Sequence, residues 1–170
     1  MPRVVLFQPQ IPPNTGNVAR TCAATASELH LIEPLGFQID DRQLRRAGLD
    51  YWSLVPLTLH PDLASFQAHR QGQGGRLVAL SSHATQPYDS FRFRPDDWLL
   101  FGRETDGLPL DLQQQADARL RIPLNRPSRN GTSGVRSLNL SVAVGVVLFE
   151  AIRQLNSGPA PLNSPSGSGC

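Results

Sequence analysis

The 170-residue chain contains no lysine, because all 16 of its basic residues are arginines. The codon composition of a GC-rich genome explains this without any function. The alternative explanation is a need for the planar guanidinium group, which binds phosphate through two parallel hydrogen bonds. The formal net charge of +2 is too small to indicate nucleic-acid binding by itself. The positions of the arginines are therefore more informative than their number.

Cysteines, long apolar runs and metal-ligand spacings are also scarce. The two cysteines, Cys22 and Cys170, make no disulfide framework. No segment reaches the roughly 18 uncharged apolar residues that a membrane span needs, and the first residues do not resemble a secretion signal. We therefore expect a soluble, cytoplasmic protein with no membrane partner. We also expect no metal, because the histidines lack metal-ligand spacing to cysteines or carboxylates: His30, His60, His69 and His83.

Two common catalytic motifs are missing. Gly102 and Gly107 frame a G-x-E-x-x-G pattern, which lacks the spacing of the dinucleotide-binding fingerprint and is also compatible with a plain tight turn after a strand. Four serines of the C-terminal third form no G-x-S-x-G elbow and have no His and Asp partners in a recognisable order: Ser128, Ser133, Ser137 and Ser141. Dinucleotide binding and serine hydrolysis are therefore disfavoured.

Apolar strand-like and helix-like segments alternate along the chain. Strands are predicted at residues 3–8, 29–32, 55–59, 76–80, 97–101 and 118–122, with 55–59 at a sheet edge because of Pro56. Helices are predicted at 18–25, 40–48, 61–71, 109–115 and 139–155, and residues 12–17 as a turn. The alternation predicts an α/β fold, a parallel sheet flanked by helices. We expect one domain over residues 1–155 and a disordered tail over 156–170.

The longest apolar run, residues 136–155, has a polar entrance. Alternating apolar residues at its start also suit a strand, but its length and its end favour a helix over 139–155. A helix that is apolar nearly all round must be buried on more than one side. Ser141 and Gly145 give it a small face, against which a second subunit can pack.

Three predicted strands end in polar or glycine-containing loops. The loops begin after Leu80, Phe101 and Ile122, and the last of them leads on to Ser137. In an open parallel sheet, ligands bind outside the carboxyl ends of the strands. The sequence therefore predicts that these loops converge on a pocket.

Two groups of polar and basic residues share helix faces. Asn17 and Arg20 are three residues apart and could present an amide and a guanidinium to an anion near a helix N-terminus. The alternative is an Asn cap beside a solvated Arg. Arg42, Arg45 and Arg46 form either a phosphate-binding patch or a solvated helix face, with nearby aromatics that could stack on a base or belong to the core: Tyr51 and Trp52.

Taken together, six segments closely resemble the SPOUT superfamily of RNA methyltransferases. They run in the family's order as NTGNVAR at 14–20, LIEPLGF at 31–37, LRRAGLDY at 44–51, FGRETDG at 101–107, RIPL at 121–124 and SLNLS at 137–141. The third segment is similar to the subgroup that methylates the ribose 2′-hydroxyl of cytidine or uridine at the tRNA wobble position. The resemblance implies a homodimer with a C-terminal trefoil knot, using S-adenosylmethionine and binding the tRNA anticodon stem-loop.

The resemblance also implies roles for individual residues. Arg20, with Asn17, would lie at the ribose being methylated, close to the subunit boundary. Because a guanidinium stays protonated, we expect Arg20 to stabilise the developing alkoxide rather than to act as a base. The cofactor would contact Leu80, Gly102, Glu104, Ile122, Ser137, Leu138 and Asn139, and RNA would contact Arg42, Arg45, Arg46, Arg129 and Arg136.

The chain departs from the family pattern at two places. Its loop between Ile122 and Ser137 is longer, so that Ser128-Arg129 competes with Arg136-Ser137 for the matching place. Val142 and Phe149 stand where the family usually has Asn and Tyr. Two alternatives therefore stay open: an enzyme that methylates ribosomal RNA or another tRNA position, and a non-catalytic RNA-binding module with the same fold.

Overall fold

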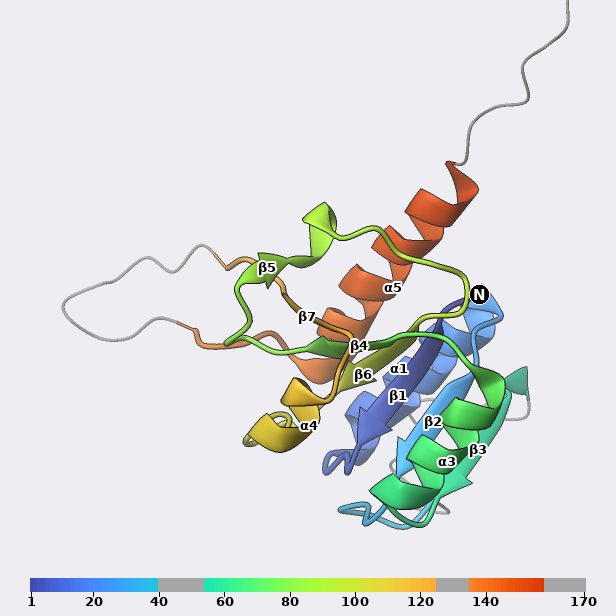
Figure 1. The fold of residues 1–170 in the computed structure, drawn as a ribbon. Helices are drawn as coiled ribbons and strands as arrows, with labels where there is room; N and C mark the ends of the chain where they lie inside the picture. The colour runs from blue at the N-terminus through green and yellow to red at the C-terminus, as the bar shows by residue number, and fades with distance from the viewer. Residues whose placement is uncertain (40–53, 125–134, 158–170) are drawn as a thin grey trace, which may run out of the picture.

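The protein forms one seven-stranded sheet in the order β3-β2-β1-β6-β4-β7-β5 (Figure 1). The structure is a computed structural model, and it describes residues 1–39, 54–124 and 135–157. All six strand pairings are parallel, which confirms the predicted parallel α/β fold. In chain order the strands are β1 Arg3–Phe7, β2 Leu29–Ile32, β3 Leu57–His60, β4 Leu77–Leu80, β5 Gln86–Pro87, β6 Trp98–Phe101 and β7 Ala118–Arg121.

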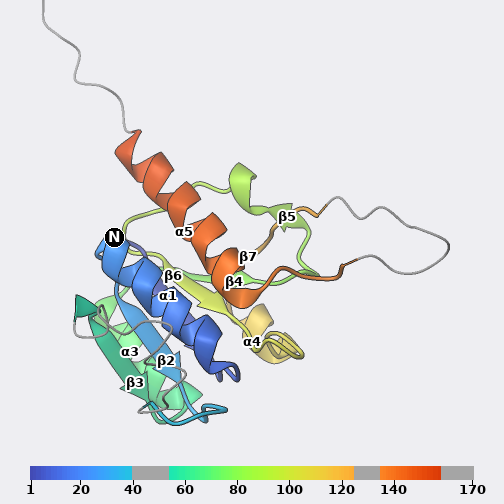
Figure 2. The same cartoon turned by 180° about the vertical axis from the view of Figure 1, so that it is seen from behind.

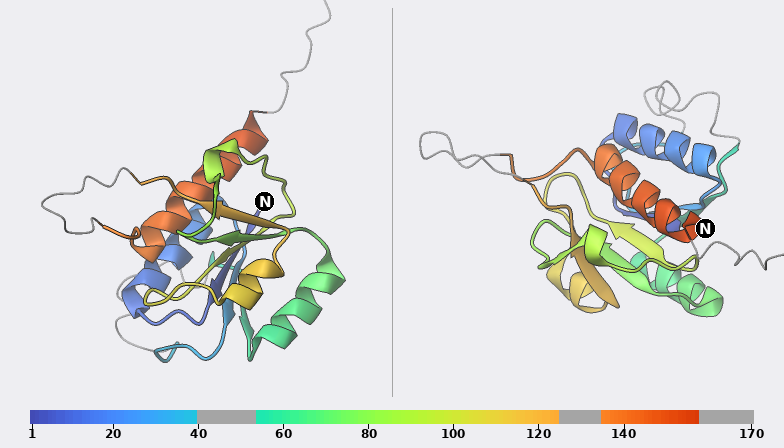
Figure 3. Two further views of the ribbon diagram at one scale, coloured as in Figure 1. Left: turned by 60° about the vertical axis from the view of Figure 1, so that its left-hand side comes forward. Right: turned by 90° about the horizontal axis from the view of Figure 1, so that it is seen from above.

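The central strands are apolar on both faces because helices cover both sides of the sheet. Every residue of β2 and β6 is buried. Helices α1, Pro12–Thr25, and α5, Leu140–Asn156, lie on one face, whereas α3, Leu63–Gln73, and α4, Leu110–Gln114, lie on the other (Figures 2 and 3). Two apolar cores result, one on each side of the sheet.

The first helix begins earlier than predicted. Residues 12–17, predicted as a turn, form the first turns of α1, which starts at Pro12 after the N-cap residue Ile11. Two consecutive prolines usually indicate a helix break. Proline nevertheless fits the first helical turn, because an N–H group at that position would have no intrahelical acceptor. The Asn cap considered for this segment is also wrong, since no side chain caps α1 within the helix.

The last helix is confirmed to within one residue. It begins at Leu140 because the Asn139 side chain accepts a hydrogen bond from the Ser141 N–H and caps it. Only one face is buried within the chain, and Val142 and Phe149 on the other face are 50% and 56% exposed. At Gly145, no atom of the other described segments lies within 4 Å of the position that a Cβ would take.

Smaller differences separate prediction and structure. Helix α3 starts at Leu63 rather than at 61, because the Asp62 side chain accepts a hydrogen bond from the Ser65 N–H. The two-residue strand β5 and the 3₁₀ turn Tyr88–Ser90 were not predicted, since such short elements carry no periodicity. Strand β3 does lie at the sheet edge, as Pro56 indicated. The predicted helix 40–48, the C-terminal trefoil knot and most of the tail predicted over 156–170 involve residues outside the described ranges, so they stay predictions. Asn156, the first residue of the predicted tail, is the last residue of α5.

In the described part of the chain, no helix is long and apolar enough to cross a membrane.

Candidate functional site

A pocket of about 740 Å³ lies at the carboxyl ends of β4, β6 and β7. Its walls come from the loops that follow these strands and from the segment that enters α5. The structure thus brings together every residue predicted to bind the cofactor, and all of them line this pocket: Leu80, Gly102, Glu104, Ile122, Ser137, Leu138 and Asn139. The predicted convergence of the loops is therefore confirmed.

The residues predicted to lie at the reacting ribose or to bind RNA are distributed differently. Arg136 lines the pocket, whereas Asn17 and Arg20 lie on an exposed face of α1 and are not part of its walls. The other four residues predicted to bind RNA lie outside the described residues: Arg42, Arg45, Arg46 and Arg129.

The loop after β6 is a tight turn that also forms a wall of the pocket. Arg103 and Gly107 form an antiparallel bridge, with N···O distances of 3.2 and 3.0 Å in the two directions. A Cβ on Gly102 would stand 2.2 Å from the carbonyl carbon of Gly107, so only glycine allows this close backbone approach. The segment from Gly102 to Gly107 is therefore a tight turn, and it also lines the pocket.

Glu104 in this loop ties the pocket to the start of α1. One carboxylate oxygen, Oε2, accepts a hydrogen bond from the Gln10 N–H at 2.9 Å. The other, Oε1, accepts from the Ile11 N–H at 3.2 Å and from the Asn14 side-chain amide at 3.1 Å. The negative charge of Glu104 also interacts favourably with the positive N-terminal end of the α1 dipole. Glu104 thus substitutes for the missing cap of α1.

Asn14 carries the connection onward to α5. Its Oδ1 accepts a hydrogen bond from Asn139 Nδ2 at 2.9 Å. Asn139 Oδ1 in turn accepts from the Ser141 N–H and hydroxyl, at 2.9 and 2.8 Å. A side-chain network therefore joins the β6 loop, the start of α1 and the start of α5. The network therefore connects two walls of the pocket, the β6 loop and the start of α5.

Sequence reasoning missed Asn14 as a member of the site. The residue is only 6% exposed and belongs to the buried face of α1 with Val18 and Cys22, at spacings of four residues. The turn predicted for residues 12–17 concealed this pattern. Had the helix been extended back to Pro12, the buried asparagine would have indicated a polar contact.

The arrangement expected for Asn17 at a helix N-terminus is not present. Asn17 lies in the second turn of α1, away from the orphan donors of the first turn. Pro12 and Pro13 have no N–H, and the Asn14 N–H is bonded to the Ile11 carbonyl at 3.0 Å. The first turn of α1 therefore offers no backbone donor to an anion, and any anion binding on this face would depend on side chains.

Charged side chains of both signs line the pocket. Arg103 donates two hydrogen bonds to Asp106, at 2.7 and 2.6 Å, and a third to the Gln8 side chain at 3.0 Å. Hydrogen bonds from the Thr105 hydroxyl and from Arg103 lower the pKa of Asp106. The carboxylates of Glu104 and Asp106 are thus committed to structural donors. Within the described ranges, no cluster of three His, Cys, Asp or Glu side chains is arranged to hold a metal ion.

The fold and the pocket define an α/β protein of the parallel-sheet class, whose ligand site lies at the carboxyl edge of the sheet. The chain belongs to the SpoU rRNA methylase family, whose family model matches residues 1–149. A relative from Beijerinckia indica, named tRNA (cytidine(34)-2'-O)-methyltransferase, is 45% identical to it over 97% of this chain and 99% of its own length.

Solved structures agree with this assignment. One that gives structural insights into the 2-OH methylation of C/U34 on tRNA is 47% identical, with a TM-score of 0.84 over 92% of this chain and 97% of its own. The SpoU methyltransferase AviRb from Streptomyces viridochromogenes, in complex with the cofactor AdoMet, is 26% identical, with a TM-score of 0.77 over 93% of this chain and 61% of its own.

Proposed function

We propose that this protein methylates the ribose 2′-hydroxyl of the wobble nucleotide, cytidine or uridine, of tRNA and uses S-adenosylmethionine as methyl donor. One observation carries the proposal: separate loops bring all residues matched to the family's cofactor motifs into one pocket. The names of the relative and of the neighbouring structure support the substrate. We place the reaction in the cytoplasm, where the substrate is found.

The residues of the pocket fit the cofactor. A volume of about 740 Å³ lies within the range of about 300–1,000 Å³ that is usual for small-molecule sites. Leu80, Ile122 and Leu138 offer apolar walls for an adenosyl group, and Ser137 and Asn139 offer polar contacts beside them. When bound there, S-adenosylmethionine supplies an electrophilic methyl group.

Arg20 contributes charge rather than proton transfer. Because its guanidinium stays protonated, it can stabilise the negative charge that develops on the ribose oxygen. It can also bind the adjacent phosphate through two hydrogen bonds. Most of the acceleration then comes from holding the ribose in line with the methyl group and excluding water.

We further propose a homodimer, with the site completed near the subunit boundary. The exposed side chains on α5, Val142 and Phe149, together with the open face at Gly145, support it. Helix α1, which carries Arg20, packs beside α5 on the same side of the sheet (Figure 2). A second subunit on this side would therefore lie near Arg20 as well.

The experiment that tests the function is incubation of the protein with S-adenosylmethionine labelled in its methyl group and with bulk tRNA, followed by mapping of the labelled nucleotide. We expect the label on the wobble ribose and none on a base. Label at another nucleotide, or none despite cofactor binding, would contradict the proposal. Ribosomal RNA belongs in the same assay, because the family is described as rRNA methylases and ribosomal RNA is therefore the second candidate substrate.

A further inference from the structure

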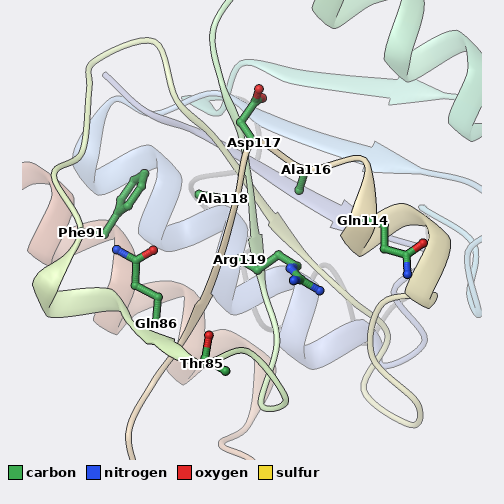
Figure 4. A pocket seen from close by; sticks show the side chains of 8 residues that line it. All are labelled: Thr85, Gln86, Phe91, Gln114, Ala116, Asp117, Ala118 and Arg119. Carbon is green, nitrogen blue, oxygen red and sulfur yellow. The ribbon is translucent and has the colours of Figure 1, made fainter.

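A second hollow, of about 550 Å³, lies beside β7 and outside the site already described. Figure 4 shows the Arg119 side chain extending from β7 toward Gln114 of α4, with Thr85 and Gln86 on the β5 side. Asp117 is the one carboxylate among the residues that line it. That carboxylate already accepts the Leu77 N–H at 2.6 Å and lies 3.9 Å from the guanidinium of Arg70.

Arg119 does not stand alone on this side of the sheet. Alternate residues of a strand point to the same face, so Arg121 lies on the face of Arg119, about 7 Å further along the strand. Leu120 between them is fully buried in the opposite core. Both arginines are exposed. They place two positive charges in a row along β7.

These two arginines differ from four other arginines of the described residues. Arg3, Arg76, Arg103 and Arg153 each have a carboxylate partner within 3.3 Å. The backbones of Arg119 and Arg121 pair with β4 and β5, but their side chains make no hydrogen bond or ion pair with any described residue. The side chains of Thr85, Gln86 and Gln114 likewise have no hydrogen-bond partner among the described residues. The hollow therefore combines an Arg119 guanidinium that has no ion-pair partner among the described residues with several unused polar groups.

We propose that Arg119 and Arg121 bind the phosphodiester backbone of the RNA substrate, a role that rests on the proposed function. Guanidinium groups form paired, charge-assisted hydrogen bonds with phosphate. Amide and hydroxyl groups, such as those of Gln86, Gln114 and Thr85, are usual partners of phosphate and sugar oxygens. The surface defined by Arg119 and Arg121 would take successive phosphates of one strand.

The position of the surface suits an RNA that also enters the pocket. Leu120 and Ile122, the neighbours of Arg121, line the cofactor pocket. The same strand end therefore presents apolar side chains to the cofactor and arginines to the other side of the sheet. An RNA strand whose ribose reaches the mouth of the pocket can continue over the edge of the sheet along β7.

A different explanation for these charges is protection of the sheet edge. The partner strand β5 pairs only with Leu120 and Arg121, so the outer edge of β7 is open at Arg119, and charges on open edges discourage pairing with other chains. That explanation predicts aggregation of the neutral variants and unchanged RNA affinity. Salt dependence separates the two explanations. The association constant K for tRNA falls with salt, and each phosphate that the protein no longer neutralises reduces the magnitude of the slope of log K against log [salt] by about 0.7–0.9.

The test compares the full-length wild-type protein with Arg119→Ala/Arg121→Ala, Arg119→Lys/Arg121→Lys and Arg94→Ala. Arg94 is a matched control, since it is exposed and precedes β6 at the opposite end of the strands. Affinity for an unmodified tRNA transcript is measured between about 0.05 and 0.3 M salt. For the double Ala variant we expect a slope whose magnitude is reduced by about 1.4–1.8 and an affinity weakened on the order of tenfold or more at about 0.1 M salt.

We expect the Lys variant to keep the salt slope and the Arg94 variant to resemble wild type. S-adenosylmethionine affinity and kcat at saturating tRNA should stay unchanged in all of them, while KM for tRNA rises in the double Ala variant. An unchanged slope in a folded double Ala variant, or an equally weakened affinity in Arg94→Ala, overturns the proposal. If wild type binds tRNA but does not methylate the wobble ribose, the proposed function fails, whereas the slopes still decide on this surface.

Discussion

Arg20 is proposed to act in methylation although it does not line the pocket of its own chain. It lies on the exposed face of α1, so its removal leaves the cofactor walls intact. We predict that Arg20→Ala abolishes methylation but changes the affinity for S-adenosylmethionine by no more than a few-fold. Single-turnover methylation of tRNA and calorimetric titration of the cofactor measure the two effects. Near-normal turnover by the variant would show that the assigned role is wrong.

At the same scale, Ser137 and Ser128 test how the long loop is aligned with the family motif. Ser137 lines the pocket, whereas Ser128 lies outside the described residues. We predict that Ser137→Ala weakens cofactor binding several-fold and more than Ser128→Ala does, because Ser137→Ala removes a polar group that lines the pocket. Calorimetry on both variants decides, and the reverse order would place the cofactor motif at Ser128-Arg129.

At the scale of the elements, Glu104 replaces a local helix cap by one supplied from a distant loop. Glu104→Ala would leave the Gln10 and Ile11 N–H groups and the Asn14 amide without their acceptor. We expect the free energy of unfolding to fall by about 2 kcal/mol and cofactor affinity to fall with it. Asp111→Ala, which removes an exposed acid of α4, is the control. Equal denaturation midpoints for the two variants would contradict the capping role.

A second prediction at this scale concerns the histidines of β2 and β3. His30 and His60 are buried, with 3.0 Å between His30 Nδ1 and His60 Nε2, and His69 of α3 lies beside both rings. Burial lowers the pKa of His30 to about 4, with a further contribution from His60 and against the opposing effect of Glu28. Burial and then the proximity of His69 also lower the pKa of His60.

The native state therefore binds fewer protons than the unfolded state between the ordinary histidine pKa of 6.5 and about 4. The contribution of the neutral, buried His30 to the free energy of unfolding is fully present above pH 6.5 and is lost as the pH falls from 6.5 to about 4. For His30 alone we expect the free energy of unfolding to fall by about 2 kcal/mol from pH 7.5 to pH 5. Denaturant titrations at several pH values measure it. His30→Gln should flatten the curve, whereas the exposed His83→Gln should not.

At the scale of the whole molecule, the exposed face of α5 predicts the assembly. Phe149→Asp places a charge in the proposed interface and should convert the dimer to a monomer. Leu110→Asp is a matched control, because Leu110 is similarly exposed, at 63% against 56%, but lies on α4 across the sheet. Sedimentation velocity measures the outcome. A wild-type monomer, or a dimer that survives the Phe149 change, would contradict the proposed interface.

Prediction from sequence succeeded where a segment's own pattern specified its environment. The buried strands β2 and β6 and the helix α5 are apolar over enough residues for their periodicity to be read locally. The predicted start of α1 was wrong because two consecutive prolines resemble a helix break. The carboxylate that accepts the hydrogen bonds at this helix start is not apparent from the neighbouring sequence. Its cap, Glu104, lies about 90 residues away in sequence. Asn14 was missed for the same reason.

The sequence by itself determined the parallel α/β class, the loops that form the pocket and the resemblance to RNA methyltransferases, because alternation and local motifs are written into consecutive residues. Only the tertiary structure decided that Glu104, Asn14 and Asn139 form one network, and that Arg119 lies beside polar side chains without a hydrogen-bond partner among the described residues. Such contacts depend on which segments the sheet order places side by side, and the order β6-β4-β7-β5 cannot be read from neighbours along the chain.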